Sequence, residues 1–238
     1  MQSRIRVKAV LKEWLKSLLF RAGYEVRKLS RFEWLLLREL ATGRPFVFVQ
    51  VGANDGVSFD SLYWFVTTHG ATGLVVEPLA DMYELLKYNY RSYPRIVPVR
   101  AAVHPSRATV TLHRVRPGSW DHLPPWATGI ASVDPLWHRI SQIPDEEIVT
   151  EEVPAVHLMT LLADYGITRL SLLQIDTEGF DVEVVKMIDF GVIRPSIIKY
   201  EAVRPGAQDD AERLLRLQGY RLERCGNDMV AWTPSPMP

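Results

Sequence analysis

Two kinds of apolar periodicity divide the chain into an N-terminal segment and a larger remainder. In residues 4–20 the apolar positions recur every three or four residues, and lysines occupy a neighbouring line along the same stretch. This spacing predicts an amphipathic basic helix. A second, short helix is predicted over residues 32–37, before a Gly and a Pro close the segment. We therefore expect an N-terminal helical extension over residues 1–44.

From residue 46 onward, short apolar runs alternate with helical patterns. Strands that are apolar throughout and separated by helices are typical of a parallel sheet covered on both faces. Residues 45–238 are thus predicted to form one doubly wound α/β domain, with a long irregular stretch over 116–147. The predicted strands cover residues 46–51, 74–77, 95–103, 108–115, 151–158, 170–176 and 196–203, and a closing hairpin covers 220–226 and 228–233. The predicted helices lie near residues 57–69, 80–90, 159–166, 178–188 and 209–219.

The charge is balanced over the whole chain but uneven along it. There are 28 Lys and Arg against 28 Asp and Glu, and eleven of the basic residues lie in residues 1–44 against four Glu. The basic helix could lie on an anionic membrane surface. Packing on the domain or on a second subunit of a homo-oligomer is favoured, because amphipathic helices commonly face a core. The neutral body, with no basic face in its motif region, argues against nucleic-acid binding.

Cysteine content and hydropathy bear on where the protein acts. The single cysteine, Cys225, excludes an internal disulfide and a zinc site built from cysteines, which suits a reducing compartment. Charged residues interrupt the apolar stretches well before the ~20 residues that a bilayer span needs. We therefore expect a cytoplasmic protein, with peripheral membrane contact through the N-terminal helix as an open alternative.

The stretch QVGANDG at residues 50–56 follows the first predicted strand of the domain. In a doubly wound fold this loop forms one wall of the ligand site. Gly52 and Gly56 would let a ligand approach the backbone closely. They supply only the outer two of the three glycines in the dinucleotide fingerprint, and Asp55 would repel a phosphate. Asn54 and Asp55 suit a cationic, amine-bearing ligand better than a pyrophosphate.

Glu77 ends the second predicted strand, twenty-one residues after Gly56. An ionised carboxylate at this place can accept hydrogen bonds from both hydroxyls of a ribose, and an acidic residue at this offset is a recurrent nucleoside clamp. A solvated loop residue is the alternative for Glu77 taken alone. Adenosine without a pyrophosphate, together with an amino-acid end, describes S-adenosylmethionine.

Three stretches resemble the FkbM family of S-adenosylmethionine-dependent methyltransferases: FVQVGANDG at 48–56, VVEP at 75–78 and LLQIDTEGFD at 172–181. A weaker likeness is TGIASV at 128–133. The resemblance runs from about residue 46 to residue 232. It implies a Rossmann-like class I methyltransferase fold with a mostly parallel seven-stranded sheet, and O-methylation of hydroxyl groups on carbohydrates, glycolipids or related natural products. The cofactor contacts that follow are Gly52, Ala53, Asn54, Asp55, Gly56, Glu77, Ala101, Ala102 and Asp176.

One residue departs from the family pattern. Many members carry an acidic residue where this chain has Gln50, so the negative charge expected beneath the sulfonium is missing, and Asp55 is the candidate to supply it. Because of Gln50, a noncatalytic binding or scaffold protein remains an alternative. A nicotinamide-dependent oxidoreductase is the rival with the same fold, since Glu77 alone would permit it.

Carboxylates gather at the predicted carboxyl ends of two later strands. Asp176, Glu178 and Asp181 follow one strand and Glu201 ends the next. Methyl transfer from a sulfonium requires a positioned acceptor and removal of its proton, and crowding of like charges would raise a carboxyl pKa toward a useful range. Asp176 is expected to line the methyl-transfer site, with Glu178 and Glu201 as acceptor-binding or base candidates. The alternative is stabilisation of the first turn of the next helix.

Two further features bear on ligands. The oxygen cluster after residue 175 could hold Mg²⁺, but no other ligand pattern supports a metal site. The irregular stretch 116–147 carries Trp120, Trp126 and Trp137, whose aromatic faces suit a sugar or a flat ring. We expect this stretch to cover the substrate; anchoring of the loop to the core is the alternative.

Overall fold

The computed structural model describes residues 28–58, 60, 62–119, 122–202 and 207–234. The helix predicted over residues 4–20 and Trp120 lie outside this part of the chain. No helix in the described part is long and apolar enough to cross a membrane.

A seven-stranded sheet forms the centre of the domain, in the order β10-β11-β9-β8-β1-β2-β3. The strands β1, β2, β3, β8 and β9 are parallel, and β11 runs antiparallel to both of its neighbours. The strand order reverses between β1 and β8, which is where doubly wound folds bind ligands. The strands are β1 (Val47–Val51), β2 (Thr72–Val76), β3 (Ile96–Val99), β8 (Leu172–Ile175), β9 (Ile197–Glu201), β10 (Arg221–Cys225) and β11 (Asp228–Trp232).

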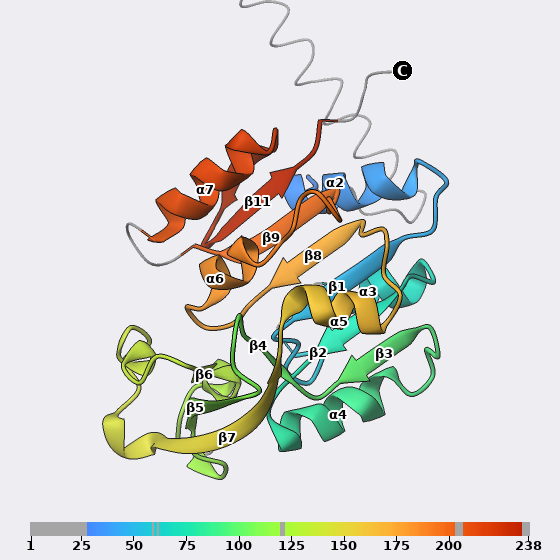
Figure 1. Cartoon of the computed structure of the whole chain (residues 1–238). Helices are drawn as coiled ribbons and strands as arrows, with labels where there is room; N and C mark the ends of the chain where they lie inside the picture. Colours follow the sequence, from blue (N-terminus) through green and yellow to red (C-terminus); the bar gives the residue numbers. More distant parts are fainter. Residues whose placement is uncertain (1–27, 59, 61, 120–121, 203–206, 235–238) are drawn as a thin grey trace, which may run out of the picture.

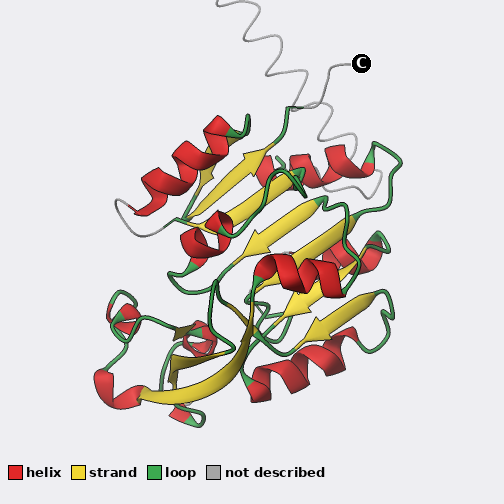
Figure 2. Cartoon of the chain, in the orientation of Figure 1, coloured by secondary structure: helices red, strands yellow, loops and turns green. Residues whose placement is uncertain are grey.

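Helices cover both faces of this sheet because its parallel strands are apolar on both sides. Successive residues of a strand point to opposite faces, so Phe48 packs in one buried cluster with α2, α3 and α4, while Val49 packs in another with α5, α6 and α7. Figure 2 shows these two helical layers around the strands. The helices are α2 (Arg31–Leu40), α3 (Leu62–Thr68), α4 (Ala80–Tyr90), α5 (Leu158–Asp164), α6 (Asp181–Lys186) and α7 (Ala207–Leu217).

A second, smaller sheet lies beyond the carboxyl ends of the central strands (Figure 1). It has the order β4-β7-β5-β6 and is made of β4 (Ala102–Val103), β5 (Thr109–Val115), β6 (Ala131–Ser132) and β7 (Ile148–Val156). Short 3₁₀ turns lie between its strands, among them η2 (Pro125–Gly129), η3 (Trp137–Arg139) and η4 (Asp145–Glu147). This sheet was not predicted. Its strand β5 alternates exposed and buried residues at its start, as strands with one solvent-facing side do.

A buried ion-pair group joins the small sheet to the main domain. The Arg114 side chain is only 3% exposed and donates to both oxygens of Asp81 on α4, at 2.7 and 2.8 Å, and to Glu151 on β7 at 2.8 Å. A bidentate pair of this kind fixes direction as well as distance. The small sheet is therefore held at a defined place over the carboxyl ends of β1 and β2.

Most predicted elements are confirmed, and one boundary difference matters for the site. The helix predicted near residues 57–69 begins only at Leu62, whose N–H donates to Asp60 Oδ1 at 2.8 Å. Asp60 satisfies a donor at the start of the helix, so the loop after β1 extends five residues farther than the pattern predicted. Asp60 thereby comes to face the ligand side of the sheet.

Candidate functional site

A cavity of about 270 Å³ opens where the strand order reverses. Its floor comes from the ends of β1, β2, β8 and β9, and its cover comes from the small sheet and η2. Among the predicted site residues, those lining the cavity are Gly52, Ala53, Asn54, Glu77, Ala101, Ala102, Asp176 and Glu178. Asp55, Gly56 and Glu201 do not line it. The structure thus brings predicted residues from segments more than one hundred residues apart to one cavity.

The first glycine of the loop is required by the neighbouring strand. Gly52 has a φ of +78°, and a Cβ at this position would lie 1.7 Å from the backbone oxygen of Asp176. The N–H groups of Gly52 and Ala53 both donate to the Val76 carbonyl at 3.0 Å. The backbone that follows β1 therefore lies against the segments that follow β8 and β2 at once, and only a glycine fits at position 52.

Gly56 and Asp55 serve the loop rather than the ligand, contrary to the prediction. A Cβ on Gly56 would meet Leu86 and Tyr90 of α4 at 2.5 and 2.6 Å, so this glycine permits helix packing. Asp55 Oδ1 accepts the N–H groups of Val57 and Ser58 at 2.9 and 2.7 Å. Because its carboxylate turns back on its own chain, Asp55 does not supply the charge beside Gln50.

Glu77 is buried at the end of β2, with an exposed fraction of 5%. Its Oε2 accepts the N–H of Asn54 at 2.8 Å and its Oε1 accepts the N–H of Leu79 at 2.9 Å. Burial raises the pKa of Glu77 to about 7, against the lowering effect of these two bonds and of Arg114. Each carboxylate oxygen keeps a second lone pair. The geometry therefore leaves Glu77 able to accept two ligand hydroxyls in a fixed orientation.

Asp176 directly follows β8, and its N–H donates to the Val51 carbonyl at 2.9 Å. Asp176 is exposed, and it lines the cavity. Removal of solvation, followed by the charges of Asp181 and Glu201, raises the pKa of Asp176 to about 8. A carboxyl group with such a pKa is an acid or base suited to neutral pH.

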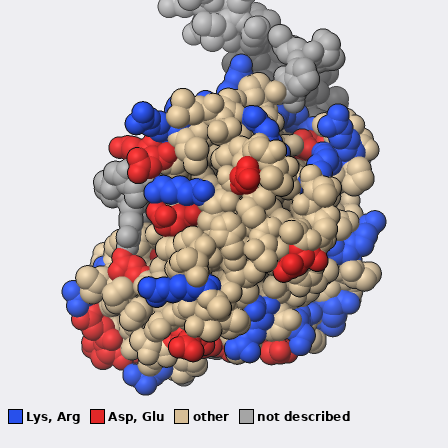
Figure 3. Space-filling view, in the orientation of Figure 1, with Lys and Arg blue, Asp and Glu red and all other residues tan. Residues whose placement is uncertain are grey.

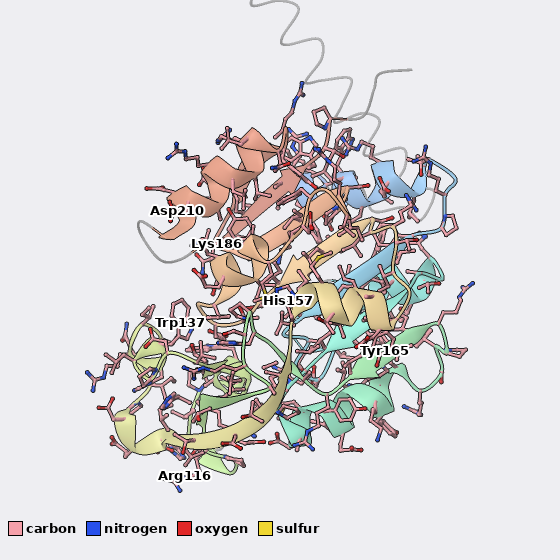
Figure 4. All side chains as sticks on the ribbon, in the orientation of Figure 1. Arg116, Trp137, His157, Tyr165, Lys186 and Asp210 are labelled. Atoms are coloured by element: carbon pink, nitrogen blue, oxygen red, sulfur yellow. The ribbon has the colours of Figure 1, made fainter. Side chains whose placement is uncertain are left out.

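Glu178 is held in place by the insertion, which is the segment 116–147 between β5 and β7. It has a φ of +53°, an uncommon conformation for a residue with a side chain. Ser132 Oγ donates to its carbonyl at 2.6 Å, and Trp137 Nε1 donates to its Oε2 at 2.5 Å. Figure 4 shows Trp137 between the insertion and the segment that leads into α6. Burial and the charge of Asp176 raise the pKa of Glu178 to about 7, although the Trp137 bond lowers it.

The two remaining carboxylates of this group have different surroundings. Asp181 is 1% exposed; its Oδ1 accepts the N–H of Glu201 at 3.0 Å and its Oδ2 accepts Thr177 Oγ1 at 2.9 Å. Asp181 is therefore a structural link between the loop after β8 and the end of β9. Glu201 is half-buried, and burial together with the Glu178 charge raises its pKa to about 7. Its side chain lies outside the cavity lining.

The lining residues that the sequence analysis missed include three long polar or charged ones: Asp60, Gln174 and Lys199. Gln50, Gln174 and Lys199 pair across β1, β8 and β9 in one register row, and Gln50 Nε2 donates to Asp60 Oδ2 at 3.2 Å. A signal was present, since β1 and β8 each carry one glutamine within an otherwise apolar run, and Lys199 follows two isoleucines in β9. The register that aligns these three residues is a property of the tertiary structure.

The insertion contributes two tryptophans in different ways. Trp126 lines the cavity and is 44% exposed, whereas Trp137 is 3% exposed. The segment 128–133 reaches the glycine loop, because a Cβ on Gly129 would lie 2.7 Å from Nδ2 of Asn54. Trp137 thus anchors the insertion, and Trp126 faces the space that a ligand would enter. Among the described residues, no group of three or more His, Cys, Asp or Glu is arranged to hold a metal ion.

Most of the chain matches the model of one protein family. The model of the methyltransferase FkbM domain matches residues 50–222. No curated protein matches the chain. The sheet order and this match together confirm the predicted class I methyltransferase fold.

Solved methyltransferase structures are similar to the chain at low identity. The ribosomal protein L11 methylase from Lactobacillus delbrueckii subsp. bulgaricus has 10% identity and a TM-score of 0.40, over 83% of this chain and 74% of that one. Human methyltransferase 10 domain containing protein has 13% identity and a TM-score of 0.42, over 92% and 94% of the two chains. The N-terminal domain of human METTL16 in complex with SAH has 12% identity and a TM-score of 0.45, over 92% and 80%.

Proposed function

Because the chain belongs to the FkbM methyltransferase domain family, we propose that it transfers a methyl group from S-adenosylmethionine to a hydroxyl group of a carbohydrate, glycolipid or related natural product. One observation carries the proposal. A single cavity is lined both by the Gly52 loop with Glu77 and by the carboxylates of Asp176 and Glu178. The nucleoside-binding elements and the candidate proton acceptors therefore share one space.

The cavity residues fit the chemistry of the cofactor. Glu77 would accept the two ribose hydroxyls, and the loop of Gly52, Ala53 and Asn54 lines the same space. Beyond β3, Ala101, Ala102 and Leu112 supply a small apolar surface for the adenine. When bound, S-adenosylmethionine supplies a methyl group that is already activated by a sulfonium. The protein then has to position the acceptor oxygen and take its proton.

Glu178 is the proposed base. It lines the cavity, whereas the other candidate, Glu201, does not. Its pKa of about 7 means that a large fraction is ionised at neutral pH, while the group remains basic enough to accept a proton. Trp137 and Ser132 hold Glu178 at one place through its carboxylate and its carbonyl. Asp176, next to Gly52, would line the position where the methyl group is transferred.

Trp126 and the carboxylates favour a sugar-like acceptor. A partly exposed aromatic face beside polar groups suits the apolar face and the hydroxyls of a sugar ring. Lys and Arg are intermingled with Asp and Glu on the face shown in Figure 3, which does not favour a polyanionic nucleic acid as acceptor. Contact of the 1–44 extension with a membrane or a second subunit, and a cytoplasmic location, remain predictions.

Two experiments test this function in sequence. Calorimetric titration with S-adenosylmethionine, S-adenosylhomocysteine and NAD should show micromolar binding of the first two alone. Transfer of a labelled methyl group from S-adenosylmethionine to simple sugars and glycolipids should then give base-stable ethers. Asp176→Asn should retain cofactor binding and lose turnover, while Asp164→Asn, an exposed control at the end of α5, should retain both. Binding of NAD instead, or methylation of amines but not hydroxyls, would overturn the proposal.

A further inference from the structure

We propose that one face of α2 docks on an anionic lipid bilayer, with its tryptophan in the interfacial region and its basic side chains beside lipid phosphates. This α2 face consists of Lys28, Leu29, Arg31, Trp34, Leu37 and Arg38. The inference goes beyond the proposed methyl transfer and does not depend on it. Of the two contacts predicted for the 1–44 extension, it favours the membrane over a second subunit.

The α2 face is the side of the helix that the domain leaves uncovered. Phe32, Leu35 and Leu36 are buried in the cluster that packs on the central sheet. Trp34 and Leu37 are 45% and 42% exposed. Side chains three residues apart on a helix are neighbours, so these two form one apolar surface. Apolar surface that stays exposed among polar groups marks an interaction site.

Two arginines frame the exposed tryptophan. The guanidinium carbons of Arg31 and Arg38 each lie 5.6 Å from the centre of the Trp34 ring, which is within cation–π distance. At a membrane interface, tryptophan rings lie at the level of the headgroups, and basic side chains beside them are attracted to anionic lipids. The composition of the α2 face is therefore that of a membrane interface.

The charge of this part of the chain is positive. The acidic residues of α2 are engaged with other groups: Glu33 accepts the N–H of the helix N-cap at 2.8 Å, and Glu39 is buried against Arg169 at 2.7 Å. Arg31 pairs with Glu223 on β10 at 2.8 Å, so one of the three positive charges of the α2 face is balanced. Residues 1–27, which precede the face, add seven basic residues against two Glu.

This positive charge decides among the possible partners of the α2 face. The basic helix predicted over residues 4–20 would place its lysines beside the arginines of α2. A second copy in a two-fold contact would bring the same arginines together. Like charges in close contact disfavour both arrangements. An anionic bilayer offers negative charge and an apolar interface at once, and each Lys or Arg near its surface strengthens binding.

The side of the sheet that carries α2 exposes further aromatic surface. The helices α3 and α4 pack on the same side and expose Trp64 and Tyr88 at 70% and 61%. The guanidinium carbon of Arg91 lies 3.8 Å from the centre of the Tyr88 ring, which repeats the pairing seen at Trp34. Trp34 does not line the cavity, so a substitution there tests docking without changing the proposed active site.

Co-sedimentation of the whole chain with vesicles tests the docking. Vesicles of phosphatidylglycerol and phosphatidylcholine in equal parts should bind the protein at least about tenfold more tightly than vesicles of phosphatidylcholine alone. Raising NaCl from about 0.1 M to about 1 M should weaken this binding, because salt screens the attraction. Trp34→Ala should weaken it about tenfold or more, because the ring no longer enters the interface.

A control and a second variant make the test specific. Tyr165→Ala removes an aromatic ring of nearly equal exposure, 44%, at the end of α5 (Figure 4), whose helix packs on the opposite side of the sheet; it should leave binding unchanged. Leu37→Glu adds a negative charge at an exposed position of the α2 face and should also weaken binding to anionic vesicles by about tenfold. It serves in place of Trp34→Ala if that variant fails to fold.

Several results would overturn the inference. Equal binding of the wild-type protein to the two kinds of vesicle, or binding to neither, would do so without any variant. If anionic vesicles bind the wild-type protein, Trp34→Ala and Leu37→Glu equally tightly, the α2 face is not the docking surface. Light scattering that shows a dimer which Trp34→Ala dissociates, without vesicle binding, would assign the face to a second copy. These measurements need neither cofactor nor acceptor, so they succeed or fail separately from the proposed function.

Discussion

Replacing Glu77 with Gln should weaken cofactor binding, and it should do so more at pH 8 than at pH 6. In the ligand-free protein the pKa of Glu77 is raised to about 7 by burial. The carboxylate must be ionised to accept two ribose hydroxyls while it also accepts the N–H groups of Asn54 and Leu79. Because roughly nine-tenths of Glu77 is ionised at pH 8 and roughly one-tenth at pH 6, the factor by which Glu77 strengthens cofactor binding should fall about tenfold from pH 8 to pH 6.

The size of the effect follows from the number of charge-assisted bonds. Each hydrogen bond to a charged group contributes about 1.5–3 kcal/mol, and Gln keeps one acceptor oxygen but has neither the charge nor the second acceptor. Loss of one such bond corresponds to about 10- to 150-fold in Kd at pH 8. At pH 6 the wild-type residue is mostly protonated, so the ratio between variant and wild-type Kd should shrink by about tenfold.

Calorimetric titration with S-adenosylhomocysteine at the two pH values measures this ratio directly. Other carboxyl groups of the cavity titrate in both proteins, and the ratio removes their common effect. Glu84→Gln, which changes an exposed carboxylate on α4, is the matched control. A ratio that stays near one, or one that is equally large at both pH values, would refute the assignment of an ionised Glu77 to the ribose.

Three other outcomes are expected. Gly52→Ala should destabilise the protein by at least about 3 kcal/mol, because its Cβ would meet the Asp176 carbonyl. Gly226→Ala, at a residue that also has a positive φ but has open space around it, should cost about 1 kcal/mol. Equal losses in the free energy of unfolding, measured by chemical denaturation, would contradict this. Trp137→Phe should lower kcat and move the pH profile of kcat to higher pH, with S-adenosylhomocysteine affinity unchanged. The hydrogen bond from Trp137 lowers the pKa of Glu178, so removing it should raise that pKa. An unmoved profile would count against a positioning role. The free energy of unfolding without ligand should fall from pH 5 to 8, because the raised pKa values of Asp176 and Glu178, about 8 and 7, let the folded state keep protons that the unfolded state has lost. In urea titrations, the free energy of unfolding should fall less steeply with pH for Asp176→Asn than for the wild-type protein. An equal dependence on pH in the two proteins would exclude this origin.

The central sheet was predictable because its determinants are local. Uniformly apolar strands separated by helical patterns require a covered parallel sheet, and the helix predicted over residues 80–90 has these bounds in α4. The closing hairpin was also confirmed. The small sheet escaped prediction because β4, β5 and β7 look like other strands of one domain, and no local pattern states which strands pair with each other.

The site shows the same division between local pattern and tertiary placement. Strand ends carry ligand-binding residues in any doubly wound fold, so the sequence by itself identified Gly52, Glu77, Asp176 and Glu178 as candidates for one site, and they line one cavity. It could not show that Asp55 faces its own turn, since the partners of a side chain depend on the path of the backbone.

Tertiary structure alone decided which polar residues meet inside the protein. Gln50, Gln174 and Lys199 lie on three different strands, and each lies next to apolar residues of its strand. Strand register places them in one row, and the late start of α3 brings Asp60 against them. The apolar pattern therefore determines that a sheet forms and where it ends, because burial depends on composition. The register and loop path determine the chemistry between strands, because hydrogen bonds and ion pairs act only over a few ångströms.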